Sequence, residues 1–407
     1  MKILVTSLYF YPDHSGIALY SSDFAFYAAE QGHDVKVVTG YSFYPKWKKR
    51  DEDKGKIFSK EIKNNVEILR GYISVPKTPT TLTRVIQEAT FCASALVSYF
   101  KSGRPDVIVA FTTPISIGFL ASVFKRLFKC KLLINVQDFQ LEAAASLGMA
   151  NQGSAFKILS VLENKSYKTA NTVSSISDSM CALLSTNKKL PDNKIYYWPN
   201  WIDVDKYKPD ATRKGNFRKN NAIDPQKKII AYAGNIGLKQ GLDSLVDLAE
   251  AYKHNDKIQF LIIGEGAGAE QLREYASEKE LSNLLFIPLL NPEQYLDFLA
   301  DLDIFFLSQK KTQFDVYFPS KLLGLMAAEK LLLLSADDES ELYKTIKKNE
   351  IGLVSKYGDI KELISQLDKL ITDDDVTKSL YTATKKYVQQ FDRDHVLTNV
   401  LKKLSDL

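Results

Sequence analysis

The chain has 407 residues, a length that predicts two or three domains, and its composition is that of an ordinary globular protein. Hydrophobic residues make up 45% and charged residues 25% of the sequence, which excludes disordered and collagen-like classes. The net charge is +5, but residues 1–200 carry 25 Lys+Arg against 16 Asp+Glu, whereas residues 201–407 carry 29 against 33. This division, +9 and −4, reflects either chance differences between solvated faces or a partner that attracts the basic half.

The cysteines and the first residues indicate the compartment. Cys92, Cys130 and Cys181 are far apart and form no CxxC pair, which argues against a disulfide framework and a structural zinc site. The sequence begins with an apolar run, residues 2–6, that predicts a buried strand and not a signal peptide. We therefore expect a soluble, cytoplasmic protein.

An uncharged stretch, residues 107–124, is as long as a transmembrane helix. Because Pro114 and Gly118 interrupt it, the pattern favours a strand, a loop and then a helix over residues 115–129. The end of this helix interleaves apolar residues with cations, which suits an anionic bilayer surface. It also suits a core-facing helix whose cations lie near its C-terminus. The cations are Lys125, Arg126 and Lys129.

Short apolar runs rich in β-branched residues alternate with helix-period segments in both halves of the chain. This alternation predicts an α/β fold with parallel sheets covered by helices. The expected strands are residues 2–8, 34–39, 67–72, 107–111, 131–136, 172–175 and 195–198, and then 228–233, 258–263, 284–288, 304–307 and 331–335. We therefore expect two doubly wound, Rossmann-like domains that face each other across a cleft.

The polar segment 199–203 is expected to connect these domains, which places the first in residues 1–200 and the second in residues 201–384. A final helix, expected over roughly residues 376–407, would reach back, so that about residues 385–407 join the first domain. Ligands of open parallel sheets bind outside the carboxyl ends of the strands. The default site is therefore the cleft between the domains.

Three loops that follow expected strands contain glycines able to approach an anion. Gly16 precedes a helix whose N-terminal amides favour phosphate, although a tight turn without a ligand fits equally well. Residues 264–269 fit G-x-G-x-x-A but lack the carboxylate that a dehydrogenase needs after the next strand, so we expect contact with a phosphate or ribose. In the third loop, residues 234–241, Lys239 opposes the dipole of the next helix, which indicates either an anionic ligand or a solvated surface lysine.

Two further segments carry polar side chains on the expected ligand-facing edges. Asp138 follows a buried strand and can serve as a general base, bind a sugar hydroxyl or simply form a turn. Ser320 is expected to cap a helix whose start, with Lys321, can bind phosphate or can be a cap alone. The four histidines show no metal-ligand spacing, so no metal site is predicted.

Several of these segments together resemble the GT-B glycosyltransferases of family 4 (group 1), in collinear order from residue 1 to about residue 390. They are Gly16 before a helix, Gly32–Val35, Ser177–Met180, Pro199–Asp203, Tyr232–Gly237, and Pro319–Lys321 followed by Met326–Ala328. Residues 136–139 and 147–149 are similar to the WcaI-type subgroup of colanic acid and O-antigen enzymes.

The resemblance implies a hexosyltransferase-type enzyme that transfers a sugar from a nucleotide-sugar with retention, without a metal or another cofactor. The second domain would bind the donor and the first the acceptor, and Asp138 would face the reacting sugar or the acceptor hydroxyl. Cations and helix dipoles would then stabilise the departing diphosphate. The implied donor-binding residues are Gly16, Asn235, Lys239, Glu265, Pro319, Ser320 and Lys321.

The chain departs from the family pattern at three positions. Many members carry two glutamates eight residues apart, and Val316 and Gly324 occupy those places here. Ribose anchoring by the second glutamate is therefore absent or supplied by another residue. Gln137 stands where many relatives have histidine.

These expectations describe a cytoplasmic enzyme that builds a bacterial capsule or O-antigen on a lipid-linked saccharide. The donor expected first is GDP-fucose, from the subgroup similarity, and a UDP-sugar is the alternative. The basic first domain would rest on the anionic inner face of the cell membrane, and no nucleic-acid partner is expected. A nucleotide-sugar epimerase of the same fold and a catalytically inactive sugar-binding relative remain alternatives.

Overall fold

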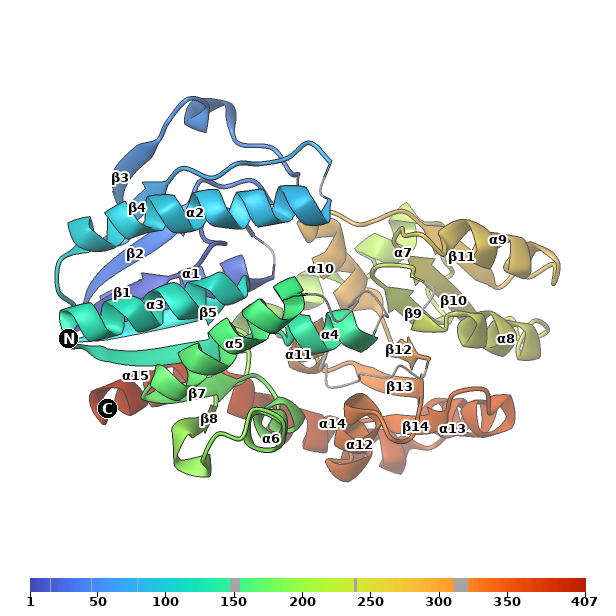
Figure 1. Ribbon diagram of the computed structural model, residues 1–407. Coiled ribbons are helices and arrows are strands. Elements are labelled where there is room, and N and C mark those ends of the chain that lie inside the picture. The colour runs from blue at the N-terminus through green and yellow to red at the C-terminus, as the bar shows by residue number, and fades with distance from the viewer. Residues whose placement is uncertain (15, 45, 79, 147–153, 238–239, 311–320) are drawn as a thin grey trace. The chain divides into compact units, whose positions relative to one another are not determined.

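The computed structural model describes every residue except 15, 45, 79, 147–153, 238–239 and 311–320 (Figure 1). The chain divides into two compact units. Unit 1 contains Met1–Asn200 and Val396–Leu407, and unit 2 contains Trp201–His395. Each unit has its own sheet covered by helices on both faces, so the fold is α/β with two Rossmann-like units.

The sheet of unit 1 has the strand order β3-β4-β2-β1-β5-β6-β7-β8. Its strands are β1 (Lys2–Thr6), β2 (Asp34–Gly40), β3 (Phe58–Lys63), β4 (Val66–Gly71), β5 (Val107–Thr112), β6 (Lys131–Val136), β7 (Thr172–Ser175) and β8 (Ile195–Tyr197). All of them are parallel except β3, which pairs antiparallel with β4. β3 is not among the strands expected from the sequence; it is an exposed edge strand joined to β4 by Asn64 and Asn65, both at positive φ as in a tight hairpin turn.

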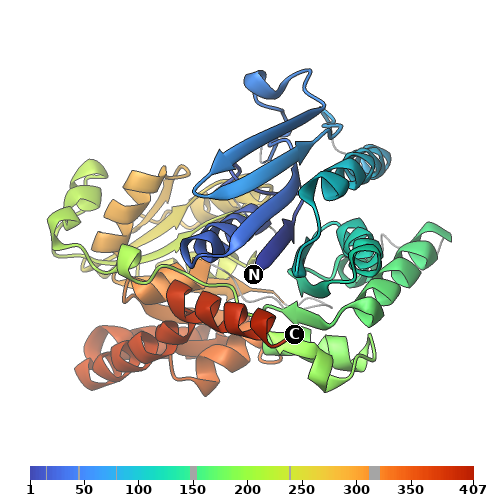
Figure 2. The same cartoon turned by 90° about the vertical axis from the view of Figure 1, so that its left-hand side faces the viewer.

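Two groups of helices cover the sheet of unit 1. They are α1 (Ile17–Glu30), α2 (Thr81–Ser102), α3 (Ile115–Phe128), α4 (Gln140–Ser146), α5 (Ser154–Thr169), α6 (Asp178–Thr186) and α15 (Arg393–Ser405). On one face α3 lies between α2 and α5 and contacts both (Figure 2). On the other face α1 and α15 are joined by the hydroxyls of Tyr27 and Thr398, 2.8 Å apart.

The sheet of unit 2 is entirely parallel, in the order β11-β10-β9-β12-β13-β14. Its strands are β9 (Lys228–Ala233), β10 (Ile258–Ile263), β11 (Leu284–Ile287), β12 (Ile304–Gln309), β13 (Leu331–Ala336) and β14 (Leu353–Lys356). Alternate residues of a strand enter different cores: Ile229 and Ala231 lie in one, and Ile230 and Tyr232 in the other. Burial on both faces explains the continuous apolar runs.

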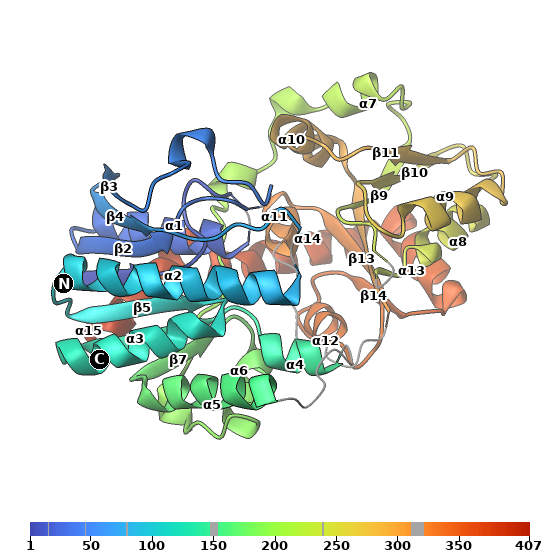
Figure 3. The same ribbon diagram turned by 45° about the horizontal axis from the view of Figure 1, so that its top comes forward.

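The helices of unit 2 alternate with these strands along the chain and pack around the sheet (Figure 3). They are α7 (Asn216–Asn220), α8 (Asp243–Ala251), α9 (Ala269–Ser277), α10 (Pro292–Asp301), α11 (Lys321–Ala327), α12 (Glu341–Lys348), α13 (Ile360–Thr372) and α14 (Asp374–Val388). Each face of the sheet packs against helices to form a hydrophobic core. One core contains residues of α8, α9 and α13, and the other contains residues of α10, α11 and α12.

The prediction of one helix over residues 376–407 is wrong, because α14 ends at Val388 and α15 begins at Arg393. The amide of Ile202 donates to the carbonyl of Phe391, and the amide of Arg393 donates to that of Ile202, each at 2.9 Å. These bonds to the connecting segment replace helical ones, so the helix breaks there. Residues from 396 onwards, and not from about 385, belong to unit 1.

The prediction for residues 107–124 is confirmed, since β5 and α3 are separate elements. In the described ranges, none of the helices combines the length and apolarity needed to cross a bilayer.

Candidate functional site

The direction of the connections in unit 2 reverses between β9 and β12. From β9 the chain continues to β10 and β11 on one side, and from β12 to β13 and β14 on the other. Loops diverge at such a reversal and leave a crevice at the carboxyl ends of the strands, where ligands bind in open α/β sheets. The loops after β9, β10 and β12 therefore surround the candidate site of unit 2.

Two glycine loops continue the pairing of β9 and β10 beyond the ends of the strands. The amide of Gly234 donates to the carbonyl of Ile263 at 2.9 Å. The amide of Ile236 then donates to the carbonyl of Glu265 at 2.8 Å. A Cβ on Gly264 would lie only 1.9 Å from the Gly234 carbonyl oxygen, and the φ of Gly264 is +131°. Glycine is therefore required where the two backbones touch.

Lys321, the first residue of α11, brings an ammonium to this pair of loops. Its Nζ lies 3.3 Å from the carbonyl oxygen of Ala233 and 3.5 Å from the Tyr232 hydroxyl, over whose ring it sits at 4.4 Å. Burial lowers the pKa of Lys321 to about 8. Within the described ranges no carboxylate forms an ion pair with it, so a half-buried cation faces the loops with only neutral partners.

The structure brings three of the predicted donor-binding residues to one edge of unit 2. Asn235 and Glu265 are exposed in the two paired loops, and Lys321 lies against the start of the first. The backbone of the first loop is held by the Tyr232 hydroxyl, which donates to the carbonyl of Asn235 at 2.8 Å. The remaining predictions, Lys239, Pro319 and Ser320, fall outside the described residues, as does Val316.

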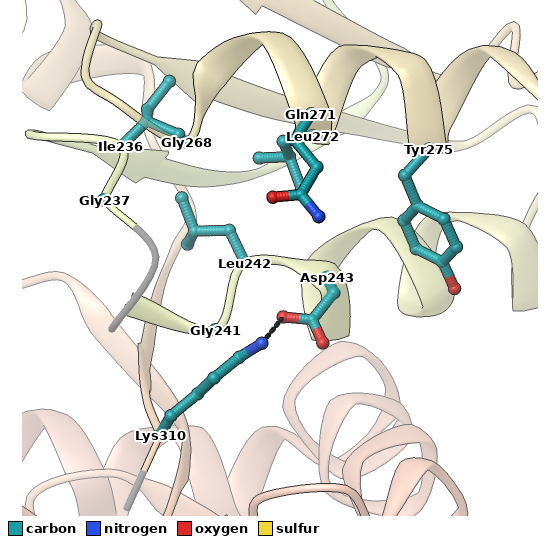
Figure 4. A pocket seen from close by; sticks show the side chains of 10 residues that line it. All are labelled: Ile236, Gly237, Gly241, Leu242, Asp243, Gly268, Gln271, Leu272, Tyr275 and Lys310. Atoms are coloured by element: carbon teal, nitrogen blue, oxygen red, sulfur yellow. Dashed lines mark ion pairs between the residues drawn. The ribbon is translucent and has the colours of Figure 1, made fainter. Parts of the chain in front are cut away.

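A pocket of about 390 Å³ opens beside these loops (Figure 4). Leu242 and Asp243 line it at the start of α8, and Gln271, Leu272 and Tyr275 line it along α9. Its lining is therefore part apolar and part polar, as is usual for a small-molecule site.

Lys310, directly after β12, completes this pocket and pairs with Asp243 at 3.3 Å. The Tyr357 hydroxyl donates to the other oxygen of Asp243 at 2.7 Å, so the carboxylate is held from two sides. None of these residues is predicted from the sequence, because the strand expected over residues 304–307 ends two residues before the end of the observed β12 and so does not place Lys310 at the carboxyl edge.

Gly324 lies in the middle of α11, buried. A Cβ at this position would meet Ile202 and Tyr207 at 3.6–3.8 Å, which is ordinary van der Waals contact. A Cβ would therefore fit at this position. Because glycine has no side chain, residue 324 cannot bind a ribose as the glutamate of other family members would.

In unit 1 the connections reverse between β1 and β5, and Gly16 ends the loop after β1. Its φ of 58° and ψ of −135° are accessible essentially to glycine alone, although a Cβ would meet nothing within 4 Å. The requirement for glycine is therefore conformational, and the first amides of α1 follow it, as an anion site would need.

Asp138 lies just past β6, at the carboxyl edge of the sheet of unit 1. The residue is exposed, yet partial burial of its carboxylate raises its pKa, and a hydrogen bond from the Phe139 amide opposes this rise. Gln137 instead points inward: its Nε2 donates to Asn135 Oδ1 at 2.7 Å, and Asn135 donates to Ser174 at 3.1 Å. The position at which relatives carry histidine thus belongs to a buried polar network here.

A buried ion triad fixes the helix that follows Asp138. Lys188 Nζ lies 2.5 Å from Glu142 of α4 and 2.5 Å from Glu163 of α5. The side chains of Lys188 and Glu163 are only 7% and 2% exposed. Breaking such a pair leaves an uncompensated buried charge, so the triad holds α4 firmly against α5.

Among the residues that the structure describes, no group of three His, Cys, Asp or Glu side chains is arranged to hold a metal ion. The thiols of Cys92, Cys130 and Cys181 are free.

Comparison with known proteins supports this architecture. The family model for glycosyltransferase family 4 matches residues 14–206, and the model for glycosyl transferases group 1 matches residues 213–388. WcaI of Escherichia coli K12, described as a colanic acid biosynthesis glycosyl transferase, is 28% identical over 84% of this chain and 85% of its own.

Two solved structures are similar over essentially their whole length. Sucrose-phosphate synthase from Thermosynechococcus elongatus has a TM-score of 0.74 at 16% identity and covers 100% of this chain and 98% of its own. HepE of Anabaena, solved in complex with UDP, has a TM-score of 0.72 at 13% identity and covers 100% of both chains. The two family models together span nearly the whole chain, and this protein therefore belongs to the group 1, family 4 glycosyltransferases of the GT-B fold.

Proposed function

We propose that this glycosyltransferase transfers a sugar from a nucleotide-sugar to a lipid-linked saccharide in the synthesis of a bacterial surface polysaccharide. The observation that carries the proposal is the Lys321 ammonium, which lies half-buried against the paired glycine loops with neutral partners alone among the described residues. A diphosphate would supply the missing negative charge. The colanic acid description of WcaI and the UDP complexes of HepE support the pathway and the donor class.

In the proposed reaction the acceptor hydroxyl oxygen attacks the anomeric carbon while the bond from that carbon to the diphosphate oxygen breaks. Lys321, the loop amides and Lys239 take up the charge that develops on the leaving diphosphate, so this role does not require a metal. The leaving oxygen can itself accept the proton of the acceptor hydroxyl on the same face, which retains the anomeric configuration. Asp138, with its raised pKa, would bind the reacting sugar or the acceptor hydroxyl.

The pocket of about 390 Å³ beside the loops is the proposed place of the nucleoside. Leu242 and Leu272 offer apolar surface to a base, and Gln271 offers an amide for its polar edge. The similarity to the WcaI-type subgroup favours GDP-fucose, whereas the HepE complexes with UDP and UDP-glucose favour a UDP-sugar.

For the acceptor we propose the carboxyl edge of unit 1, and for the location the anionic inner face of the cell membrane. The support for the membrane is an apolar face made by α2, α3 and α5, which present large exposed side chains beside cations. Its residues are Leu82, Val85, Ile86, Leu96, Val97, Phe100, Val123, Leu127, Ile158, Leu159 and Val161.

The test is a panel of nucleotide-sugars measured by equilibrium binding and by release of the nucleoside diphosphate. We expect one donor to bind saturably, and the Lys321→Ala variant to bind it at least about tenfold more weakly, a loss of about 1.4 kcal/mol. The exposed Lys348 of α12 provides the matched control, since Lys348→Ala removes a cation outside the loops. If no nucleotide-sugar binds, the proposal is wrong.

The alternatives predict different outcomes in the same assay. An epimerase would convert the donor sugar without any acceptor, whereas a transferase needs one to form product. An inactive relative would bind donor but show no turnover in the parent protein. For a transferase, the Asp138→Asn variant should lose turnover while its donor affinity remains unchanged.

A further inference from the structure

Aromatic side chains gather at the carboxyl edge of unit 1, on the loops that follow β1 and β2. The ring centroids of Tyr9 and Tyr44 are 5.7 Å apart, and those of Tyr44 and Trp47 are 6.4 Å apart. Both pairs meet edge to face, at 74° and 78°. Tyr44 is 37% exposed and Trp47 is half-buried. We call Tyr9, Tyr44 and Trp47 the ring shelf.

Charged side chains from α2 border the ring shelf. The guanidinium of Arg84 lies 5.5 Å from the centre of the Trp47 ring. Glu88, one turn later, accepts a hydrogen bond of 3.3 Å from Ser116 at the start of α3 and has no ion-pair partner in the described part of the chain. Burial raises the pKa of Glu88, and burial together with the charge of Glu88 raises that of Tyr9 to about 12. The carboxylate therefore lies within electrostatic reach of the shelf.

The ring shelf is held in place by the buried carboxylate of Asp13. Asp13 accepts hydrogen bonds from the Ser42 hydroxyl and from the backbone amides of Phe43 and Tyr44. These bonds tie the loop after β2 to the loop after β1, which ends at Gly16. The rings are thus preorganised next to the predicted anion-binding helix start of the same unit.

Packing alone does not account for this arrangement. Trp47 has a φ of 50°, in the left-handed region that bulky residues rarely adopt, and such backbone strain costs about 1–3 kcal/mol. The half-buried carboxylate of Glu88, with one long hydrogen bond, adds a desolvation cost. Backbone strain and a carboxylate with one hydrogen bond, beside partly exposed rings at a ligand-binding edge, are features of binding sites.

We propose that the ring shelf and Glu88 form the subsite for the acceptor saccharide. The sugar stacks its C–H face on Tyr44 and Trp47 and donates a hydroxyl hydrogen bond to Glu88. The exposed apolar face of α2 includes Leu82 and Val85, which flank Arg84 in the sequence. A lipid attached to the sugar therefore leaves along this apolar face. This inference rests on the proposed function, because it assigns an acceptor to the transfer.

The sequence offers a direct reporter of the subsite. Of the three tryptophans, Trp198 and Trp201 are buried and Trp47 alone is partly exposed. We therefore expect octyl glycosides of glucose, galactose and N-acetylglucosamine to change the tryptophan fluorescence saturably for at least one member. The same glycoside should protect Trp47 from quenching by acrylamide. The Trp47→Phe variant should lose the signal.

Kinetics then test the roles of the residues in transfer. Glu88→Gln and Trp47→Ala are expected to raise the acceptor KM at least about tenfold and to leave the donor KM within about twofold. Tyr381→Ala, which removes an exposed tyrosine of unit 2, is the control and should change neither. Because the donor KM is measured in the same variants, a folding defect would be recognised by its effect on both constants.

The outcomes separate this inference from the proposed function. If the parent turns over a donor but both variants keep the parental acceptor KM, the subsite is wrong and the function stands. If no donor binds yet a glycoside quenches Trp47 in the parent and not in Glu88→Gln, the subsite stands and the proposed function is wrong. The absence of any glycoside response overturns the subsite.

Discussion

Lys321, to which we assign a role in donor binding, is a cation that is costly to keep charged in the folded protein. Its ammonium lies over the Tyr232 ring and near the carbonyl of Ala233, and burial lowers its pKa to about 8 from an ordinary value of 10.5. A lowered lysine pKa means that the folded protein disfavours the charged form. A bound diphosphate reverses that preference, because it places negative charge beside the ammonium. If a diphosphate binds here as proposed, proton uptake and ligand binding are coupled at this residue.

The first prediction follows from this coupling. Below about pH 8 Lys321 is protonated and attracts the diphosphate, and above it the free protein loses this charge, so affinity for the nucleoside diphosphate should fall as pH rises. Titration calorimetry from about pH 7 to about pH 9.5 should give a fall in affinity that begins near pH 8. Proton uptake on binding should appear in the same range, from the dependence of the measured heat on the buffer.

Lys321→Arg provides the control, since a guanidinium remains charged over this whole range. The variant should bind with a flatter pH profile than the parent, whatever its absolute affinity. An equally steep fall in the arginine variant would show that another group is responsible for the titration.

At the scale of elements, the paired loops after β9 and β10 depend on glycine more than on any side chain. The Cβ of an alanine at position 264 would meet the backbone oxygen of Gly234 at 1.9 Å, which no change of rotamer relieves. We expect Gly264→Ala to destabilise the protein by about 1–3 kcal/mol, as other overpacked sites do, and to abolish saturable donor binding. Urea unfolding and donor titration measure the two effects.

Gly324→Ala is the matched control within the same unit. There the Cβ makes ordinary contacts at 3.6–3.8 Å inside α11, and alanine is the better helix former by about 0.5–1 kcal/mol. We therefore expect unchanged or slightly higher stability and unchanged donor affinity. Equal stability of the Gly264→Ala and Gly324→Ala variants would contradict the close contact between the two loops.

These elements also show which features can be predicted from the sequence. The central strands are predictable because continuous apolar runs require burial on both faces. The resemblance to family 4 implies Asn235, Glu265 and Lys321 as donor-binding residues, and the structure places the three at one edge of unit 2. In contrast, the break at residues 389–392 depends on hydrogen bonds to distant Ile202, which no local pattern encodes.

The same limit explains the missed parts of the candidate sites. The pairing of Asp243 with Lys310 joins residues from different strand–helix connections. The ring shelf likewise requires two loops and α2 to converge, and its residues look like ordinary core aromatics when taken one by one. Local sequence predicts where a loop leaves a sheet, but the contacts among such loops arise only in the folded unit.

At the scale of the whole molecule, residues 1–200 carry a net charge of +9 and residues 201–407 one of −4. Part of this excess positive charge lies beside an exposed apolar face of unit 1. Its apolar face exposes Phe100, Leu127 and Val161 by 64%, 54% and 64%. The cations Lys101, Arg126, Lys157 and Lys165 are exposed on the same three helices. The carboxylates of these helices do not offset them, because Glu163 is buried and Glu88 is half-buried. Apolar side chains among unopposed cations are the pattern that binds anionic bilayers.

The resulting prediction is that the protein sediments with vesicles that contain anionic lipid and much less with neutral ones. Each exposed apolar side chain that inserts contributes about 1.5–3 kcal/mol. Phe100→Ser/Leu127→Ser should therefore weaken binding by at least about tenfold. Arg126→Glu/Lys157→Glu should weaken it through charge, by about 1 kcal/mol or more per residue, and high salt should reduce the difference from the parent.

The matched control replaces apolar residues that are equally exposed but lie outside the apolar face. Ile57 and Ile62, beside and within β3, are 61% and 72% exposed, so Ile57→Ser/Ile62→Ser removes a similar apolar area. If binding follows general surface hydrophobicity, this control should bind as weakly as Phe100→Ser/Leu127→Ser. If α2, α3 and α5 form the membrane face, it should bind like the parent. If binding depends on neither lipid charge nor salt, the charge difference between the two halves has no role in membrane binding.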